Sequence, residues 1–193
     1  DTWGGTLSHE TYLQFSLPCL KRIVNSVKRE RHGQKIPTIV FTKGCAPWIK
    51  EISEIGADAM GVDWTVSLGE VRALTQDRVA LQGNLDPSVL FAGTEVVREQ
   101  ARKVIEDFGQ VSNGGHVFNL GHGIDKDTDP EVVAALVDED LPKIYGTEPE
   151  TRSSVQKLLI CIEVSSKFFI GWKEDYSHRL WQKGSQMLLW TRR

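Results

Sequence analysis

The sequence predicts an α/β protein built from parallel strand-helix units. Four short apolar runs that favour strands recur along the chain, at residues 38–43, 58–64, 79–85 and 116–121. Each run is followed by a helix-like segment, and successive runs begin about 20 to 40 residues apart. Such spacing leaves room for the helical crossover that joins two parallel strands. Either half of a barrel or a doubly wound sheet satisfies this pattern.

The first helix is expected to begin at Ser8, because apolar residues then recur at three- and four-residue steps as far as Val27. Pro18 lies inside this periodic stretch and predicts a kink or two joined helices. A basic segment, residues 28–35, follows this stretch. Gly33 within it is the expected C-cap of the helix.

Shorter apolar stripes predict helices between the later strands, at residues 48–55, 68–74 and 95–108. Thr94 is the expected N-cap of the last of these helices. After the fourth strand, Asp129 and Pro130 indicate another helix start, because Asp caps and Pro suits the first helical turn.

Polar side chains stand where the predicted strands end. They are Lys43 after the first strand, Asp63 after the second, Asn84 and Asp86 after the third, and Asn119 and His122 after the fourth. Carboxyl ends of parallel strands meet at one edge of a sheet, where α/β folds place their chemistry. Turn formation or helix capping explains any one of these residues equally well. Their repetition at four strand ends favours a site.

Composition limits the class of protein further. The chain has 193 residues, is 40% hydrophobic and 25% charged, and carries a net charge of −3, so it can bury one core and does not suggest a nucleic-acid-binding protein. No uncharged apolar run reaches the roughly 18 residues of a membrane span. The three cysteines, Cys19, Cys45 and Cys161, are too far apart for a zinc pair. They are typical of reduced thiols, and we expect a cytoplasmic protein.

The charge balance divides the chain near residue 142. Residues 143–193 hold nine Lys and Arg against five Asp and Glu, whereas residues 1–142 hold 14 against 21. We therefore predict a folded unit over residues 1–142 and a divergent extension over 143–193, with a helix near residues 155–169. Three tryptophans lie among the basic residues of the extension, a combination that can indicate contact with nucleic acid or a membrane surface. The sequence shows neither a nucleic-acid-binding motif nor a clean basic amphipathic helix, so we do not favour such a contact.

Five short segments, in their order and spacing, resemble the carboxyl-terminal half of bacterial uroporphyrinogen decarboxylases. They are DTWGG at residues 1–5, FTKG at 41–44, GVDWT at 61–65, LQGNLDP at 81–87 and NLGHG at 119–123. The resemblance covers about residues 1–138. It implies the last four strand-helix units of a (β/α)8 barrel, preceded by the loop after the fourth barrel strand, and so favours a barrel over an open sheet.

The resemblance also implies an activity, namely cofactor-free decarboxylation of the four acetate side chains of uroporphyrinogen III to give coproporphyrinogen III in haem biosynthesis. It implies a tetrapyrrole substrate, a homodimer and no metal. Thr2 matches the hydroxyl residue of the family's acidic-Ser/Thr loop, and His122 matches the histidine of its Gly-His-Gly motif. Both are substrate-contacting positions in that family.

Other functional positions of the family have no match here. Its amino-terminal arginines, its pyrrole-binding aspartate and a tyrosine from mid-chain belong to segments before the part that this sequence resembles. We therefore assign no catalytic residue, and expect these 193 residues by themselves to be incomplete for catalysis.

Two alternatives remain at this point. A non-catalytic half-barrel could act as a structural or dimerising module, because half a barrel has two open strand edges. Cobalamin- or coenzyme M-linked methyltransferases share the barrel but hold zinc on His and Cys ligands. This sequence has no His-x-Cys motif, and Cys45 stands apart from other metal-ligating residues, so the methyltransferase alternative is the weaker one.

Overall fold

A computed structural model describes residues 1–109 and 115–136, and these form a four-stranded parallel sheet with helices on one face. The strands lie side by side in chain order, as β3 (Ile39–Phe41), β4 (Ala59–Gly61), β5 (Ala80–Leu85) and β6 (His116–Leu120). The register places Met60 beside both Val40 and Leu81. The predicted parallel α/β class is confirmed. β3, β4 and β6 end one to three residues before their predicted limits, and β5 ends at Leu85 as predicted.

The first helical stretch is a joined helix, as Pro18 predicted. It runs through α1 (His9–Thr11), a π-helical segment (Tyr12–Ser16) and α2 (Leu17–Ser26). Ser8 caps its start, since its side chain accepts a hydrogen bond from the Thr11 amide at 3.2 Å. Pro18 lies in the first turn of α2, immediately after the π-helical segment. A proline has no N–H to donate, so the helical hydrogen-bond pattern changes there.

The prediction that Gly33 caps this helix is wrong. The helix ends at Ser26, and Gly33 instead lies in the turn of an antiparallel hairpin formed by β1 (Glu30–Arg31) and β2 (Gln34–Lys35). His32 and Gly33 both have positive φ values, 53° and 76°, as tight two-residue hairpin turns require.

Asp58 anchors this hairpin to the start of the sheet. Its carboxylate accepts hydrogen bonds from Arg29, just before the hairpin, from Lys35 in β2, and from the Thr38 amide at 2.8 Å. Burial opposes ionisation of Asp58, but the hydrogen bonds from Lys35, Thr38 and Arg29 outweigh it and lower the pKa of this carboxyl group well below its usual range.

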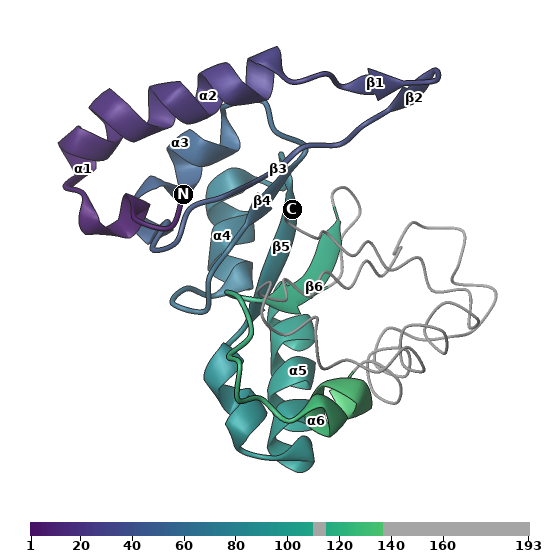
Figure 1. The fold of residues 1–193 in the computed structure, drawn as a ribbon. Helices are drawn as coiled ribbons and strands as arrows, with labels where there is room; N and C mark the ends of the chain where they lie inside the picture. The colour runs from purple at the N-terminus through teal and green to yellow at the C-terminus, as the bar shows by residue number, and fades with distance from the viewer. Residues whose placement is uncertain (110–114, 137–193) are drawn as a thin grey trace.

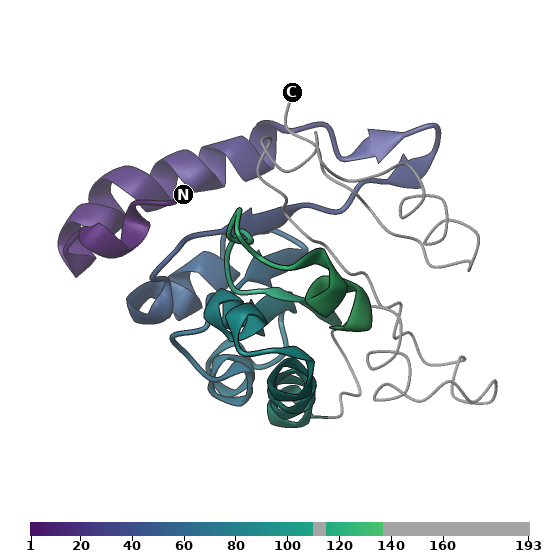
Figure 2. The same ribbon diagram turned by 60° about the horizontal axis from the view of Figure 1, so that its bottom comes forward.

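The later helices cover one face of the sheet, as Figures 1 and 2 show. They are α3 (Ile49–Ser53), α4 (Leu68–Thr75), α5 (Thr94–Phe108) and α6 (Pro130–Ala135), with short 3-10 turns at Gly4–Thr6, Ala46–Trp48 and Pro87–Phe91. Asp129 caps α6 as predicted, accepting from the Glu131 amide at 2.9 Å. Thr94 does not cap α5, because it is already helical and Gly93 takes the cap position.

The core lies between these helices and the sheet, in two clusters. The first packs α2, α3 and α4 against β3 to β5 around Trp48, whose ring stacks on Tyr12 at 4.1 Å between centroids. The second packs α5 and α6 against β5 and β6 around Phe118. The opposite face of the sheet is less covered, since Ile39 is 42% exposed while its neighbour Val40 is 5% exposed.

Among the residues that the structure describes, no helix is long and apolar enough to cross a bilayer. The predicted helix near residues 155–169 and the predicted boundary between 1–142 and 143–193 lie outside the described ranges.

Candidate functional site at the strand ends

His122 lies at the carboxyl edge of the sheet, two residues beyond β6, and its side chain is partly exposed. Its ring centroid is 6.2 Å from that of Phe41 at the end of β3, and 6.4 Å from that of Trp64 after β4. β3 and β6 are the first and last strands of the four-stranded sheet. The segment after β6 crosses the ends of the inner strands, since the Gly121 amide donates to the Leu85 carbonyl at 2.7 Å and Gly121 lies against the backbone of Trp64. This crossing fits a curved sheet, with His122 over its concave face.

The segment that carries Thr2 joins the same edge. The Asp1 amino group donates to the Phe41 carbonyl at 2.6 Å, and the Lys43 amide donates to the Asp1 carbonyl at 2.9 Å. These two bonds are the pattern of a parallel bridge onto β3. Thr2 follows at once and is exposed, and among the described residues its hydroxyl has no hydrogen-bond partner. The structure therefore places both predicted substrate contacts, Thr2 and His122, at the end of the sheet where Phe41 lies.

Asp63 has the structural role that turn formation predicts. Its carboxylate accepts from the Gly44 amide and from the amide and hydroxyl of Thr65, the second of these at 2.9 Å. The residue is 1% exposed. Asp63 therefore ties the loop after β3 to the loop after β4, and these two loops carry Lys43 and Trp64.

The side chains of Asn84 and Asp86 also form hydrogen bonds within the fold. The Asn84 amide donates to the carbonyls of Asp63 and Val66, at 3.0 and 2.7 Å. Asp86 caps the turn after β5, accepting from the amide and hydroxyl of Ser88 at 2.9 and 2.7 Å. These contacts shape the strand ends. Of the strand-end residues predicted from the sequence, Thr2, Lys43, Asn119 and His122 remain, and the buried side-chain oxygen of Asn119 has no hydrogen-bond partner in the described part of the chain.

The walls of the site are aromatic, and sequence reasoning missed them. Phe41 and Trp64 flank the His122 ring, and the ammonium nitrogen of Lys43 lies 5.9 Å from the centroid of the Trp64 ring. The alternation along β3 could have indicated Phe41, because it lies two residues before Lys43 and so on the same face. Nothing local to the sequence showed that Trp64 would reach His122.

Glycines permit the close approach of these loops. A Cβ on Gly121 would lie 2.6 Å from the Trp64 amide nitrogen, and one on Gly5 would lie 2.8 Å from the Lys43 carbonyl oxygen. Real Cβ atoms do not come so close to backbone atoms, so a side chain at either position would push two loops of the site apart.

Cys45 lies beneath this edge and is fully buried. Burial, helped by the negative charge of Asp63, raises the pKa of its thiol to about 11. The thiol is therefore protonated at neutral pH and does not suit nucleophilic attack. Within residues 1–109 and 115–136 no cluster of three or more His, Cys, Asp or Glu side chains could hold a metal ion.

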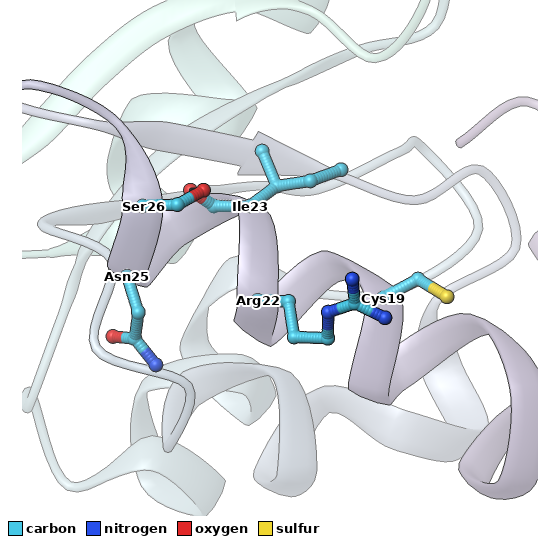
Figure 3. A pocket seen from close by; sticks show the side chains of 5 residues that line it. All are labelled: Cys19, Arg22, Ile23, Asn25 and Ser26. Carbon is cyan, nitrogen blue, oxygen red and sulfur yellow. Dashed lines mark hydrogen bonds between the residues drawn. The ribbon is translucent and has the colours of Figure 1, made fainter.

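A separate pocket of about 550 Å³ lies against α2 and is lined by Cys19, Arg22, Ile23, Asn25 and Ser26 (Figure 3). These residues all come from one helix and none of them belongs to the strand-end loops. The pocket is therefore distinct from the site around His122.

A curved parallel sheet with helices outside it and a site at its strand ends defines part of a (β/α)8 barrel. The family model described as uroporphyrinogen decarboxylase (URO-D) matches residues 1–139. The chain belongs to the uroporphyrinogen decarboxylase family.

Curated relatives agree with this assignment. Uroporphyrinogen decarboxylase from Thioalkalivibrio sulfidiphilus is 58% identical over 139 residues, which are 72% of this chain and 39% of that protein. The enzyme of that name from Dechloromonas aromatica is 56% identical over 138 residues, again 72% and 39% of the two chains. The chain thus spans about two fifths of the length of these relatives.

A solved structure shows the same fold. A methyltransferase from Methanosarcina mazei matches with a TM-score of 0.61 and 19% identity, over 76% of this chain and 41% of that chain. At this identity the likeness shows the fold alone and lends no support to a methyltransferase activity.

Proposed function

We propose that this chain supplies part of the substrate site of a uroporphyrinogen decarboxylase, a carboxy-lyase that converts the four acetate side chains of uroporphyrinogen III to methyl groups. The observation that carries the proposal is the arrangement at the sheet edge, where His122 stands between two aromatic rings in a chain of this family. The product would be coproporphyrinogen III, on the route to haem.

The chemistry needs no cofactor. When CO₂ leaves an acetate side chain, the electron pair that remains must be delocalised, and a protonated pyrrole ring can accept it. The protein then has to bind the carboxylates, orient the macrocycle and place a proton donor. In this scheme the Thr2 hydroxyl and the His122 imidazole are hydrogen-bonding groups for substrate carboxylates, and neither is the acid.

The aromatic walls fit a ligand of this class. A tetrapyrrole has a broad apolar ring system edged by carboxylates, and the rings of Phe41 and Trp64 offer flat apolar contact beside the polar His122. The family's arginines and pyrrole-binding aspartate have no counterpart among these 193 residues.

We further propose that the functional enzyme is a cytoplasmic homodimer.

The first prediction is binding without turnover. The purified 193-residue chain should bind uroporphyrin, the stable oxidised form of the substrate macrocycle, but should not convert acetate to methyl groups on uroporphyrinogen at an enzymic rate. Missing proton-donating and charge-stabilising groups each forfeit about two to four powers of ten in rate. Fluorescence titration measures the binding, and chromatography of the porphyrin products measures turnover.

His122→Asn is the variant that tests the site. An amide keeps hydrogen-bonding capacity, so the affinity for uroporphyrin should fall only a few-fold, while His9→Asn, an exposed control on α1, should leave it unchanged. Absence of binding by the unaltered chain would favour a purely structural half-barrel. Turnover within about tenfold of a full-length decarboxylase would mean that the essential residues are misplaced.

A further inference from the structure

Lys43 is an exposed cation placed between the two predicted substrate contacts. Its amide donates to the Asp1 carbonyl, and its carbonyl accepts from the Gly5 amide, both at 2.9 Å. The segment from Asp1 to Gly5 carries Thr2, so the backbone of Lys43 is held directly by that segment. The Lys43 side chain reaches the Trp64 ring, which also contacts His122.

The ammonium group of Lys43 forms no ion pair with any residue in the described part of the chain. The nearby carboxylates are engaged elsewhere. Asp63 accepts from Gly44 and Thr65, Asp86 accepts from Ser88, and Asp1 accepts from Ser16 at 2.6 Å. Hydrogen bonds thus hold these three carboxylates in other positions, and none of them forms an ion pair with Lys43 in the described part of the chain.

The Trp64 ring limits the positions that the Lys43 ammonium group takes. The nitrogen lies 5.9 Å from the ring centroid, within the range of a cation-π contact. Such a contact occupies one side of the ammonium group and leaves N–H donors for an anion. Because Trp64 also meets the His122 ring edge-on, the two nitrogen-bearing groups share one aromatic wall.

We infer that Lys43 is a third substrate-binding residue, whose ammonium group binds a carboxylate of the tetrapyrrole beside His122, with Trp64 as its positioning residue. This inference rests on the proposed function, because it takes a carboxylated tetrapyrrole as the ligand. Lys43 then contributes a charge-assisted hydrogen bond to the affinity for a carboxylated macrocycle.

The test compares uroporphyrin affinity in the unaltered 193-residue chain, Lys43→Gln, Lys43→Arg and Lys50→Gln. Lys50 is the matched control, an exposed lysine on α3 that is likewise without an ion pair in the described ranges. Lys43→Gln should weaken uroporphyrin binding about tenfold and make it less sensitive to salt, because a charge-assisted hydrogen bond is lost. Lys43→Arg should restore most of the affinity, and Lys50→Gln should change little.

Circular dichroism and urea unfolding establish that each variant is folded, and a purely structural role of Lys43 would not alter the salt dependence. If the unaltered chain binds uroporphyrin and Lys43→Gln binds it as tightly as Lys50→Gln does, the inference is overturned while the proposed function stands. If the unaltered chain does not bind uroporphyrin at all, the proposed function fails and the inference fails with it.

Discussion

At the scale of single residues, the clearest energetic consequence belongs to His116 and not to the site histidine. His116 is 4% exposed at the start of β6, and its ring stacks on Phe108 at 4.5 Å between centroids. Its Nε2 atom lies 2.7 Å from the Gly83 carbonyl oxygen. A carbonyl only accepts, so Nε2 donates and a neutral ring in this position carries its proton there.

This environment predicts how stability depends on pH. Burial lowers the pKa of His116 from 6.5 to about 4, against the opposing effect of its bond to Gly83. Between pH 6.5 and pH 4 the unfolded chain binds a proton on His116 that the folded chain does not. The stability that the neutral His116 ring contributes is therefore complete above pH 6.5 and is lost as pH falls towards 4. The free energy of unfolding should be about 2 kcal/mol lower at pH 5 than at pH 7.5 from this residue.

His116→Gln supplies the comparison, because its amide can still donate to Gly83 but does not titrate. Urea unfolding at pH 5 and 7.5 should show a smaller pH dependence in this variant than in the unaltered chain or in His9→Gln, whose side chain is exposed. An unchanged pH dependence would assign the effect to other groups. The carboxyl group of Asp58 is not among them in this window, because its lowered pKa affects stability only in more acidic solution.

At the scale of elements, the site depends on how closely two strand-end loops approach. Gly121→Ala should destabilise the fold by about 1–3 kcal/mol, because the added Cβ would lie 2.6 Å from the Trp64 amide nitrogen and the loops must separate. Uroporphyrin binding should weaken as well, since His122 follows directly in the chain. Gly115→Ala is the control at the other end of β6, where a Cβ would meet Ala80 at an ordinary 3.8 Å. Urea midpoints that change equally in the two variants would contradict this explanation.

Most of the elements could be predicted from the sequence, and the misses have local reasons. Hydrophobic periodicity located the four strands of the parallel sheet and the helices, but not the hairpin of β1 and β2, and Pro18 correctly indicated a joined helix. Gly33 was misassigned because a glycine with positive φ serves a hairpin turn as well as a helix end. Thr94 was misassigned because Gly93, one residue earlier, can also take the cap position.

At the scale of the whole molecule, we propose that residues 1–142 fold without residues 143–193. The family match covers residues 1–139 and ends close to this boundary. A chain of residues 1–142 should therefore unfold cooperatively in urea, with a midpoint close to that of the 193-residue chain. Loss of the cooperative transition on truncation would show that residues 143–193 contribute to the core.

The sequence alone determined the class of fold and the identity of the strand-end residues, because both follow from local patterns. Runs of apolar residues with polar ends locate strands whatever surrounds them, and Thr2, Lys43 and His122 could be named from those ends and from the family resemblance. The sequence alone could not distinguish the carboxylates that hold loops together from the polar groups that stay available to a ligand. Asp63 and Lys43 are equally polar residues at strand ends, and both are equally explained by a turn.

Only the tertiary structure distinguishes these two kinds of strand-end residue. The curvature of the sheet brings His122 near Phe41 and Trp64, which are 81 and 58 residues away in the chain. The same packing encloses Asp63 between two loops, where backbone and hydroxyl groups use its oxygens, and leaves the Lys43 ammonium group exposed over Trp64. Which polar groups remain available to a ligand depends on contacts between distant segments, and those contacts form only when the strands pair and the sheet curves.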